Sequence, residues 1–464
     1  MPHGDVRRCA CVGKAESLKT ENRTLFETVP VWRAITRMAV PSMLTILVMV
    51  FYNMADMYFV GQTGEDAQVA AVSISGPVFT VMMAVGSLIG SGGCALMSRT
   101  LGAGDAESLK RYSSLCCWWC ILLGVLLGLG LMSFPDKLLG LLGANADIWP
   151  HAKAYVLLLA PGAPAMIFTT AFSNIIRSVG EVRRSMISGL ISTAVNLALD
   201  PLFILALGMG TGGAALATVI GNAAGAVYLT AVIGRGGTGL TLRPGPALMR
   251  PFDIWRVMLM GLPNAVSSFM TGFASVFANR MLVSYGTLAV AAMGAAQKST
   301  RIISMMQMGL AMGVQPLLGY CCGAGLRTRL AETMKKLTLL TAALGSALSL
   351  GCLFGSRAIV ALFLEEQSAI ELGGYMIKLL VLSGPFLGLF YASTSFLQSA
   401  GRPMLATGTA LLRQGVLFIP LIYVMNHFFG VTGNICAHLA ADLCSTAVSF
   451  ALMCVVYRRQ KNGT

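Results

Sequence analysis

Long apolar stretches recur along the whole chain and alternate with short polar segments. Each stretch runs for about 18 residues or more with few charges, which is typical of helices that cross a lipid bilayer. The stretches lie at residues 38–60, 68–98, 110–132, 150–176, 183–207, 211–234, 253–285, 287–318, 332–355, 369–399, 403–427 and 431–457. The pattern therefore predicts an all-α integral membrane protein with twelve transmembrane helices.

The composition agrees with this prediction. Of the 464 residues, 56% are hydrophobic and 11% are charged, whereas roughly 25% are charged in an ordinary soluble domain. Residues 1–37 are polar and basic and lack the apolar core of a cleaved signal peptide. We expect them to form a cytoplasmic N-terminal tail that ends in an interfacial segment.

The formal net charge of +14 could indicate a nucleic-acid partner. Most of the 33 Lys and Arg residues, however, lie in the two tails and in the loops on one side of the predicted membrane. This distribution follows the positive-inside rule and predicts that both termini, including the tail 458–464, are cytoplasmic. The basic excess then reflects topology, and we expect no nucleic-acid partner.

The two halves of the chain repeat each other at an offset of about 221 residues. Matching landmarks are Pro41 and Pro263, Gly104 and Gly325, Pro164 and Pro385, Gly180 and Gly401, and Gly212 and Gly433. Each half holds six predicted helices, an even number, so both halves enter the membrane in the same direction. We predict two six-helix lobes, 38–234 and 253–457, joined by a cytoplasmic loop at 235–252.

Three acidic residues fall well inside predicted spans: Asp56, Asp200 and Asp442. A charged side chain at that depth costs about 2.5–3.5 kcal/mol on insertion scales, so it usually faces a cavity and has a function. Asp56 and Asp200 both belong to the first half, and apolar residues occupy the equivalent positions of the second half. The acid chemistry is therefore predicted to lie in the N-terminal lobe.

Other polar residues reach a similar depth in that lobe. At 1.5 Å per residue, Asp56 and Asp200 lie roughly 6 to 11 Å below the outer surface, and Thr218 and Tyr155 lie at a comparable level. Asn196 lies one turn from Asp200 on the same helix face.

These oxygen-rich groups suit a proton or Na⁺ rather than a soft transition metal. The sequence thus predicts a coupling-ion site, with Na⁺ as the one metal considered, at Asp56, Asn196 and Asp200. The alternative interpretation is that each Asp only hydrogen-bonds a neighbouring helix. Pro201 removes one helical hydrogen bond, which adds a free carbonyl acceptor and a point of bending.

The cysteines and histidines indicate no further chemistry. Cys116, Cys117 and Cys120, in "CCWWC", have the spacing of a metal or redox motif but lie inside an apolar span, where small packing thiols are expected. The sequence contains no phosphate-binding loop and no nucleophile elbow. We expect neither an enzyme nor a cofactor.

Several motifs together resemble the MATE (multidrug and toxic compound extrusion) family, specifically its bacterial DinF-like branch. They are "PSMLTILVMVFYNMADMYFVG" in the first span, "NLALDPLFI" in the fifth, "MSRTLGAGD" after the second, and "GVQPLLGYCCGAG" in and after the eighth. The resemblance covers nearly everything from about residue 37 to 457.

The resemblance implies two lobes around a V-shaped central cleft, in the bacterial cytoplasmic (inner) membrane. It implies a secondary active antiporter that exports small organic cations and drugs in exchange for H⁺ or Na⁺, surrounded by lipids and active as a monomer. The family's coupling-ion residues fall here on Asp56, Asn196, Asp200, Thr218 and Tyr155. Pro41, Asn53, Asn174 and Pro201 are candidates for substrate binding or gating.

The second lobe departs from this pattern. Spans seven and ten contain no acid, so the second cation site of the family's NorM-like branch is expected to be absent. Lys298 and Arg301 lie deep in span eight, and we predict that they pair with Asp442. Contact with an anionic substrate or a lipid headgroup is the alternative, and Arg413 in span eleven has no explanation at this stage.

Three other functions remain to be compared with this one. A lipid-linked oligosaccharide or lipid flippase of the same superfamily would need a basic cavity, for which Lys298, Arg301 and Arg413 are candidates. A major facilitator protein would carry a different basic loop after span two, where this chain has "SRTLGAGDAESLKR". An intramembrane enzyme would need a catalytic dyad or metal cluster, which two Asp and one Asn do not supply.

Overall fold

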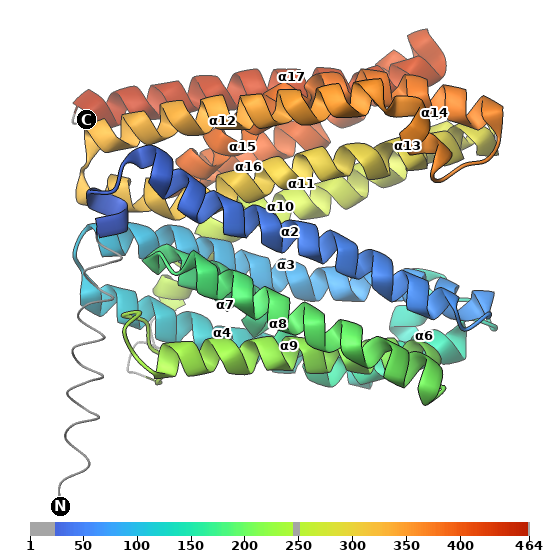
Figure 1. Cartoon of the computed structure of the whole chain (residues 1–464), viewed down its shortest axis with the longest axis horizontal. Helices are drawn as coiled ribbons and strands as arrows, with labels where there is room; N and C mark the ends of the chain where they lie inside the picture. Colours follow the sequence, from blue (N-terminus) through green and yellow to red (C-terminus); the bar gives the residue numbers. More distant parts are fainter. Residues whose placement is uncertain (1–23, 245–250, 463–464) are drawn as a thin grey trace, which may run out of the picture. The chain divides into compact units, whose positions relative to one another are not determined.

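A computed structural model describes residues 24–244 and 251–462 of the chain (Figure 1). Within these residues the chain is helical throughout, with short turns and loops between the helices. The long helices are α2 (Val31–Gly61), α3 (Asp66–Gly102), α4 (Ala106–Ser133), α8 (Val182–Asp200), α9 (Gly210–Gly234), α10 (Pro251–Val283), α11 (Thr287–Ala324), α12 (Arg327–Phe354) and α17 (Phe418–Asn462). The shorter elements are α5 (Pro135–Leu142), α6 (Trp149–Leu159), η1 (Ala160–Gly162), α7 (Ala163–Ile175), η2 (Ile176–Val179), η3 (Pro201–Ala206), α13 (Ser356–Ala361), α14 (Gln367–Leu380), η5 (Val381–Ser383), α15 (Gly384–Ser399), α16 (Pro403–Leu411) and η6 (Leu412–Val416).

Each of the twelve predicted spans falls on helical structure. In the described part of the chain, 11 continuous helical segments are long and apolar enough to cross a membrane. The last of them, Pro403–Gln460, has 58 residues. It contains the non-helical Gly430, with φ of 57°, and therefore accommodates both of the last two predicted spans. The prediction of an all-helical, twelve-span membrane protein is confirmed.

Two glycine pairs show that the halves repeat in structure as well as in sequence. Gly104 and Gly325 have φ values of 77° and 69°, and Gly180 and Gly401 have values of 87° and 75°. These left-handed conformations cost glycine little because it has no Cβ. Both pairs are separated by the predicted offset, so equivalent turns follow equivalent helices.

The chain forms two compact units, and the boundary between them falls inside a long helix at two places. Among the described residues, one unit comprises residues 24–29 and Pro41–Gly261, and the other comprises Pro30–Val40 and the residues from Leu262 onward. The change of unit therefore occurs inside α2 and inside α10, close to Pro41 and Pro263. The sequence had placed the lobe boundaries in the loops that precede these positions.

Close backbone packing explains why the start of α10 belongs to the first unit. A Cβ added to Gly92 on α3 would lie 2.0 Å from the Val257 carbonyl oxygen, and one added to Gly261 would lie 1.8 Å from the Leu88 carbonyl oxygen. Only glycine allows two helix backbones to approach this closely. Arg111 also pairs with the buried Asp253, with 3.2 Å between Nε and Oδ2.

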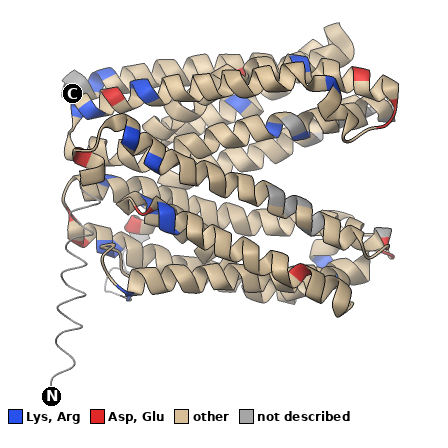
Figure 2. Cartoon of the chain, in the orientation of Figure 1, with Lys and Arg blue, Asp and Glu red and all other residues tan. Residues whose placement is uncertain are grey.

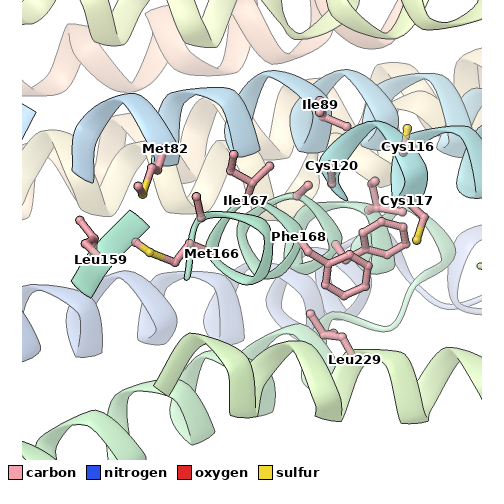
Figure 3. Packing of buried hydrophobic residues seen from close by; sticks show 14 of the residues in the cluster. Met82, Ile89, Cys116, Cys117, Cys120, Leu159, Met166, Ile167, Phe168 and Leu229 are labelled. Atoms are coloured by element: carbon pink, nitrogen blue, oxygen red, sulfur yellow. The ribbon is translucent and has the colours of Figure 1, made fainter. Parts of the chain in front are cut away.

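The core of the first unit is built largely from α3, α4 and α7, and α6 and α9 contribute residues such as Leu159 and Leu229 (Figure 3). The Phe168 and Phe172 rings of α7 stack with centroids 4.4 Å apart. Cys116, Cys117 and Cys120 are buried in the same hydrophobic cluster. The interpretation of these three as packing thiols is therefore supported by their surroundings.

Charged residues gather towards the ends of the helices, and the spans between are almost entirely uncharged (Figure 2). The sequence "LGAGD" shows how one such end is built. After the left-handed Gly104, Asp105 caps α4 by accepting a hydrogen bond of 2.9 Å from the Ser108 backbone N–H. Hydrogen bonds from Ser108 hold the pKa of the Asp105 carboxyl below its ordinary value.

Candidate functional site

The predicted site begins where the fifth span changes its helical form. Helix α8 ends at Asp200, and η3, which starts at Pro201, is a π-helix. Its wider hydrogen bonding is seen in the 2.9 Å bond from the Leu207 N–H to the Leu202 carbonyl. Proline cannot donate the usual helical hydrogen bond, and single π-helical turns inside α-helices are frequent at functional sites. The Asp200 side chain lies at this junction and is fully buried.

Thr218, on α9, connects three helices through hydrogen bonds. Asn196 Nδ2 on α8 donates to Thr218 Oγ1 at 3.3 Å, and the Tyr52 hydroxyl on α2 lies 3.3 Å from the same oxygen. Asn196 and Thr218 are both buried. The structure therefore brings these two predicted site residues into direct contact, and their role in binding an ion stays a prediction.

Glycines on α9 permit this contact by letting α8 approach closely. A Cβ added to Gly221 would lie 2.5 Å from the Ser192 carbonyl oxygen, and one added to Gly225 would lie 2.1 Å from Ser192 Oγ. Ser188 Oγ also donates to the Gly225 carbonyl at 3.2 Å. The polar layer therefore rests on a tightly packed helix pair, which fixes the positions of its side chains.

The other predicted coupling-ion residues lie on α6, α8 and α2 of the same unit. Tyr155 is buried on α6, which packs against α9. Asp200 lies one turn from Asn196 on the same helix. Asp56 lies on α2 one turn beyond Tyr52, but its side chain is outside the described residues, and so is that of Asn53.

The gating candidates have clear local roles. The Pro41 carbonyl accepts a 2.8 Å hydrogen bond from Thr45 Oγ1 one turn later in α2. Asn174 is buried on α7, and its Nδ2 donates to the Thr170 carbonyl at 2.9 Å. Pro201 is the first residue of the π-helix. Their roles in substrate binding or gating stay predictions.

Sequence reasoning missed two members of the polar layer. Tyr52 stands one turn before Asp56, in "YNMAD", and this spacing on a membrane helix was the signal for it. Asn222 stands one turn after Thr218, and its Nδ2 donates to the Thr218 carbonyl at 2.9 Å. The Asn222 carbonyl in turn accepts a 2.9 Å hydrogen bond from Thr169 Oγ1 on α7.

The layer combines a buried carboxyl group with hydroxyl and amide groups. Asn196 Oδ1 is buried and accepts no hydrogen bond from the described residues, so it is an available acceptor. Within the same residues no three His, Cys, Asp or Glu side chains form a cluster suited to a metal ion. A carboxylate with neutral oxygen donors can take up a proton, or bind a hard cation such as Na⁺.

In the second unit the structure corrects one prediction. Asp442 does not pair with Lys298 or Arg301; its partner is Arg413, with 2.7 Å between Nε and Oδ1. Lys298 and Arg301 are exposed on α11. The Lys298 ammonium lies 5.4 Å from the centroid of the Phe363 ring. The earlier prediction failed because depth along a helix does not reveal which way a side chain points around it.

Comparison with known proteins finds the same repeat. The MatE family model matches residues 41–202 and 263–424. A protein of Staphylococcus aureus named "Multidrug export protein MepA" is 29% identical over 441 residues, covering 95% of this chain and 96% of that protein. The protein of the same name in Staphylococcus haemolyticus is 28% identical over 440 residues, with the same coverage of both chains.

Solved structures share the fold at lower sequence identity. One, described as the outward-facing conformation of a multidrug resistance MATE family transporter of the MOP superfamily, has a TM-score of 0.86 and 22% identity, and the match covers 94% of this chain and 98% of the other. A second, a crystal structure of MATE in the bent conformation, has a TM-score of 0.87 and 20% identity, covering 97% and 98%. These two similarities concern the fold alone.

Proposed function

The chain belongs to the MatE family of multi-pass membrane transporters, which are not enzymes, and on this premise we propose that it is a multidrug efflux antiporter. It exports amphipathic organic cations in exchange for H⁺ or Na⁺. The relatives that match almost its whole length are named multidrug export proteins. No cofactor takes part, since the gradient of the coupling ion drives the cycle.

The observation that carries this proposal is the buried Asp200 carboxyl group beside the Asn196–Thr218–Tyr52 cluster. A carboxyl group inside a membrane span is costly unless it has a task. Asn196, Thr218, Tyr155 and Asp56 supply further oxygen atoms in the same unit. We assign the coupling ion to this group of residues.

Exchange follows from competition for one negative charge. When H⁺ or Na⁺ neutralises Asp200 and Asp56, a bound organic cation loses its electrostatic anchor and leaves. When the ion departs to the cytoplasm, the restored charge attracts the next cation. Each ligand therefore lowers the affinity for the other by the same factor, because binding linkage is reciprocal. Pro41 and the π-helix at Pro201 supply the points at which α2 and the fifth span bend.

We further propose that the protein acts as a monomer in the bacterial cytoplasmic membrane with both termini in the cytoplasm. The excess of Lys and Arg in the tails and on one set of loops supports this orientation.

The test is transport by the purified protein in proteoliposomes. Efflux of a fluorescent organic cation would be followed under an imposed pH gradient and, separately, under an imposed Na⁺ gradient. We expect wild type to respond to one gradient, which names the coupling ion. Asp200→Asn should lose at least about 100-fold of that activity, because it removes the exchanged charge, whereas Asp147→Asn, which changes an exposed acid, should retain it. If wild type moves no cation under either gradient, the proposed function is wrong.

One observation favours a second candidate. Lys298 and Arg301 are exposed on a membrane-spanning helix, and Asp442 is paired with Arg413 instead. An anionic substrate, such as a lipid-linked oligosaccharide pyrophosphate, would suit two such cations. A flippase would move such a lipid in the same liposomes and would depend on Arg301 rather than on Asp200.

A further inference from the structure

Arg413 places a guanidinium group inside the last long helical segment of the second unit. Its side chain is 9% exposed and lies within Pro403–Gln460, which is apolar enough to cross a membrane. A cation at such a place is retained only when neighbouring groups replace its hydration. The side chains around Arg413 therefore indicate which kind of cation this part of the unit can bind.

Three kinds of contact hold the guanidinium. Nε donates to Asp442 Oδ1 at 2.7 Å, and Nη1 donates to the Tyr391 hydroxyl at 3.3 Å. The guanidinium carbon lies 5.1 Å from the centroid of the Phe390 ring and 5.5 Å from that of Tyr391. A carboxylate, a phenol oxygen and two aromatic rings are the parts from which proteins build sites for free organic cations.

The Arg413 side chain does not cover Asp442 and Tyr391 completely. The Asp442 side chain is 13% exposed and Tyr391 is partly exposed, so part of the surface of each group stays uncovered. The rings come from α15 and the carboxylate from α17, two helices that pack on each other. Arg413 itself comes from η6, so the groups that contact its guanidinium are positioned by other helical elements.

The backbone at Arg413 shows the same local feature as the site of the first unit. Arg413 lies in the π-helical turn Leu412–Val416, and Asp200 directly precedes the π-helical turn Pro201–Ala206. Such turns are rare and are found frequently at functional sites. Each unit therefore presents an ionisable side chain at a π-helical turn inside a span.

We propose that Asp442, Tyr391 and Phe390 form a second cation-binding site, in the C-terminal unit, that takes planar delocalised cations of the guanidinium or amidinium class and is occupied in the native protein by the side chain of Arg413. The tethered guanidinium neutralises Asp442 and excludes external cations. Ion exchange is thereby confined to the carboxyl groups of the first unit.

The test removes the guanidinium group of Arg413 and then adds a small free cation that could take its place. Arg413→Gln removes the charge and keeps a side chain of moderate length. The purified full-length variant would be titrated with benzamidine, a planar amidinium, and its apparent Tm recorded. We expect a saturable rise of about 2 °C or more at ten times the half-saturating concentration, because the probe binds only the folded protein. Sodium chloride at the same ionic strength should produce no saturable rise.

The double variant Arg413→Gln with Asp442→Asn isolates the site, because its N-terminal unit is unchanged. The proposal requires that the rise in this variant be no larger than the rise in wild type, because the first-unit carboxyl groups are the same in both proteins. If Arg413→Gln does not fold, Arg413→Met replaces it, since methionine also removes the charge and keeps an unbranched side chain of similar length.

An equal rise in the variants with and without Asp442, an equal rise with sodium chloride, or no rise in any vacated variant would overturn the proposal. Because the readout is binding rather than transport, such a result leaves the proposed function standing. Conversely, failure of the transport assay leaves this site testable.

Discussion

Thr218 shows how a single hydroxyl can set the geometry of a buried site. Its Oγ1 is within hydrogen-bonding distance of both Asn196 Nδ2 and the Tyr52 hydroxyl. The three residues come from three helices of the first unit, so the hydroxyl holds an amide and a phenol in place near Asp200. Loss of this one oxygen atom leaves buried polar groups without their partner, which costs more than the hydrogen bond itself contributes.

Thr218→Val should therefore weaken ion coupling while Thr218→Ser preserves it. Valine has nearly the shape of threonine but offers no hydroxyl to Asn196 or Tyr52. A loss of about 1–3 kcal/mol from an unpaired buried group corresponds to about 5- to 150-fold in apparent ion affinity. The measurement is the ion concentration that gives half-maximal efflux in proteoliposomes. Equal values for the Val and Ser variants would show that the hydroxyl has no part in coupling.

At the scale of elements, the spans were predictable and their side-chain partnerships were predictable only in part. Apolar length fixes where a chain crosses a membrane, so every predicted span fell on a helix. Depth along the helices was enough to predict that Asn196 and Thr218 lie at the same level, because the number of helical turns between each residue and the outer surface can be counted. The choice of Arg413 as the partner of Asp442 depends on how helices rotate about their axes, and a π-helical turn alters that rotation.

The close packing of α8 and α9 gives a test at this scale. Gly221→Ala places a methyl group 2.5 Å from the Ser192 carbonyl oxygen, which belongs to the backbone and moves only with its helix. We expect a destabilisation of about 1–3 kcal/mol, seen as a lower apparent Tm, together with weakened ion coupling. Gly234→Ala on the same helix meets no atom within 4 Å and is the matched control. A Gly221→Ala variant as stable and as active as this control would contradict the packing argument.

At the scale of the whole molecule, helix α10 begins in one compact unit and ends in the other. Its first residues are attached to α3 and α4 by the Gly92 and Gly261 contacts and by the Arg111–Asp253 pair. The loop before it is attached as well, since Ser113 Oγ and Ser114 Oγ donate to the carbonyls of Thr241 and Arg243 at 2.9 and 2.6 Å. These attachments could not be predicted from the sequence, because charged loop residues are equally consistent with full exposure to water.

The Arg111–Asp253 pair should stabilise the first unit measurably. Asp253 is 5% exposed, and removing its partner leaves a buried charge uncompensated. We expect Arg111→Gln to lower the apparent Tm by several degrees. Adding Asp253→Asn should restore part of the loss, because the double variant buries no charge. Additive losses in this double-mutant cycle would show that the two side chains act independently.

The division of α2 and α10 between the units also has a consequence for how the protein is made. A ribosome releases residues 30–40 long before the rest of their unit exists, and it completes residues 41–244 before residues 251–261, which finish the first unit. The first half therefore cannot reach its final packing as soon as its own six helices are synthesised, whereas the second half finds residues 30–40 already in place. Assembly of the first unit must wait for the start of α10 to enter the membrane, so the order of translation couples the maturation of the two halves.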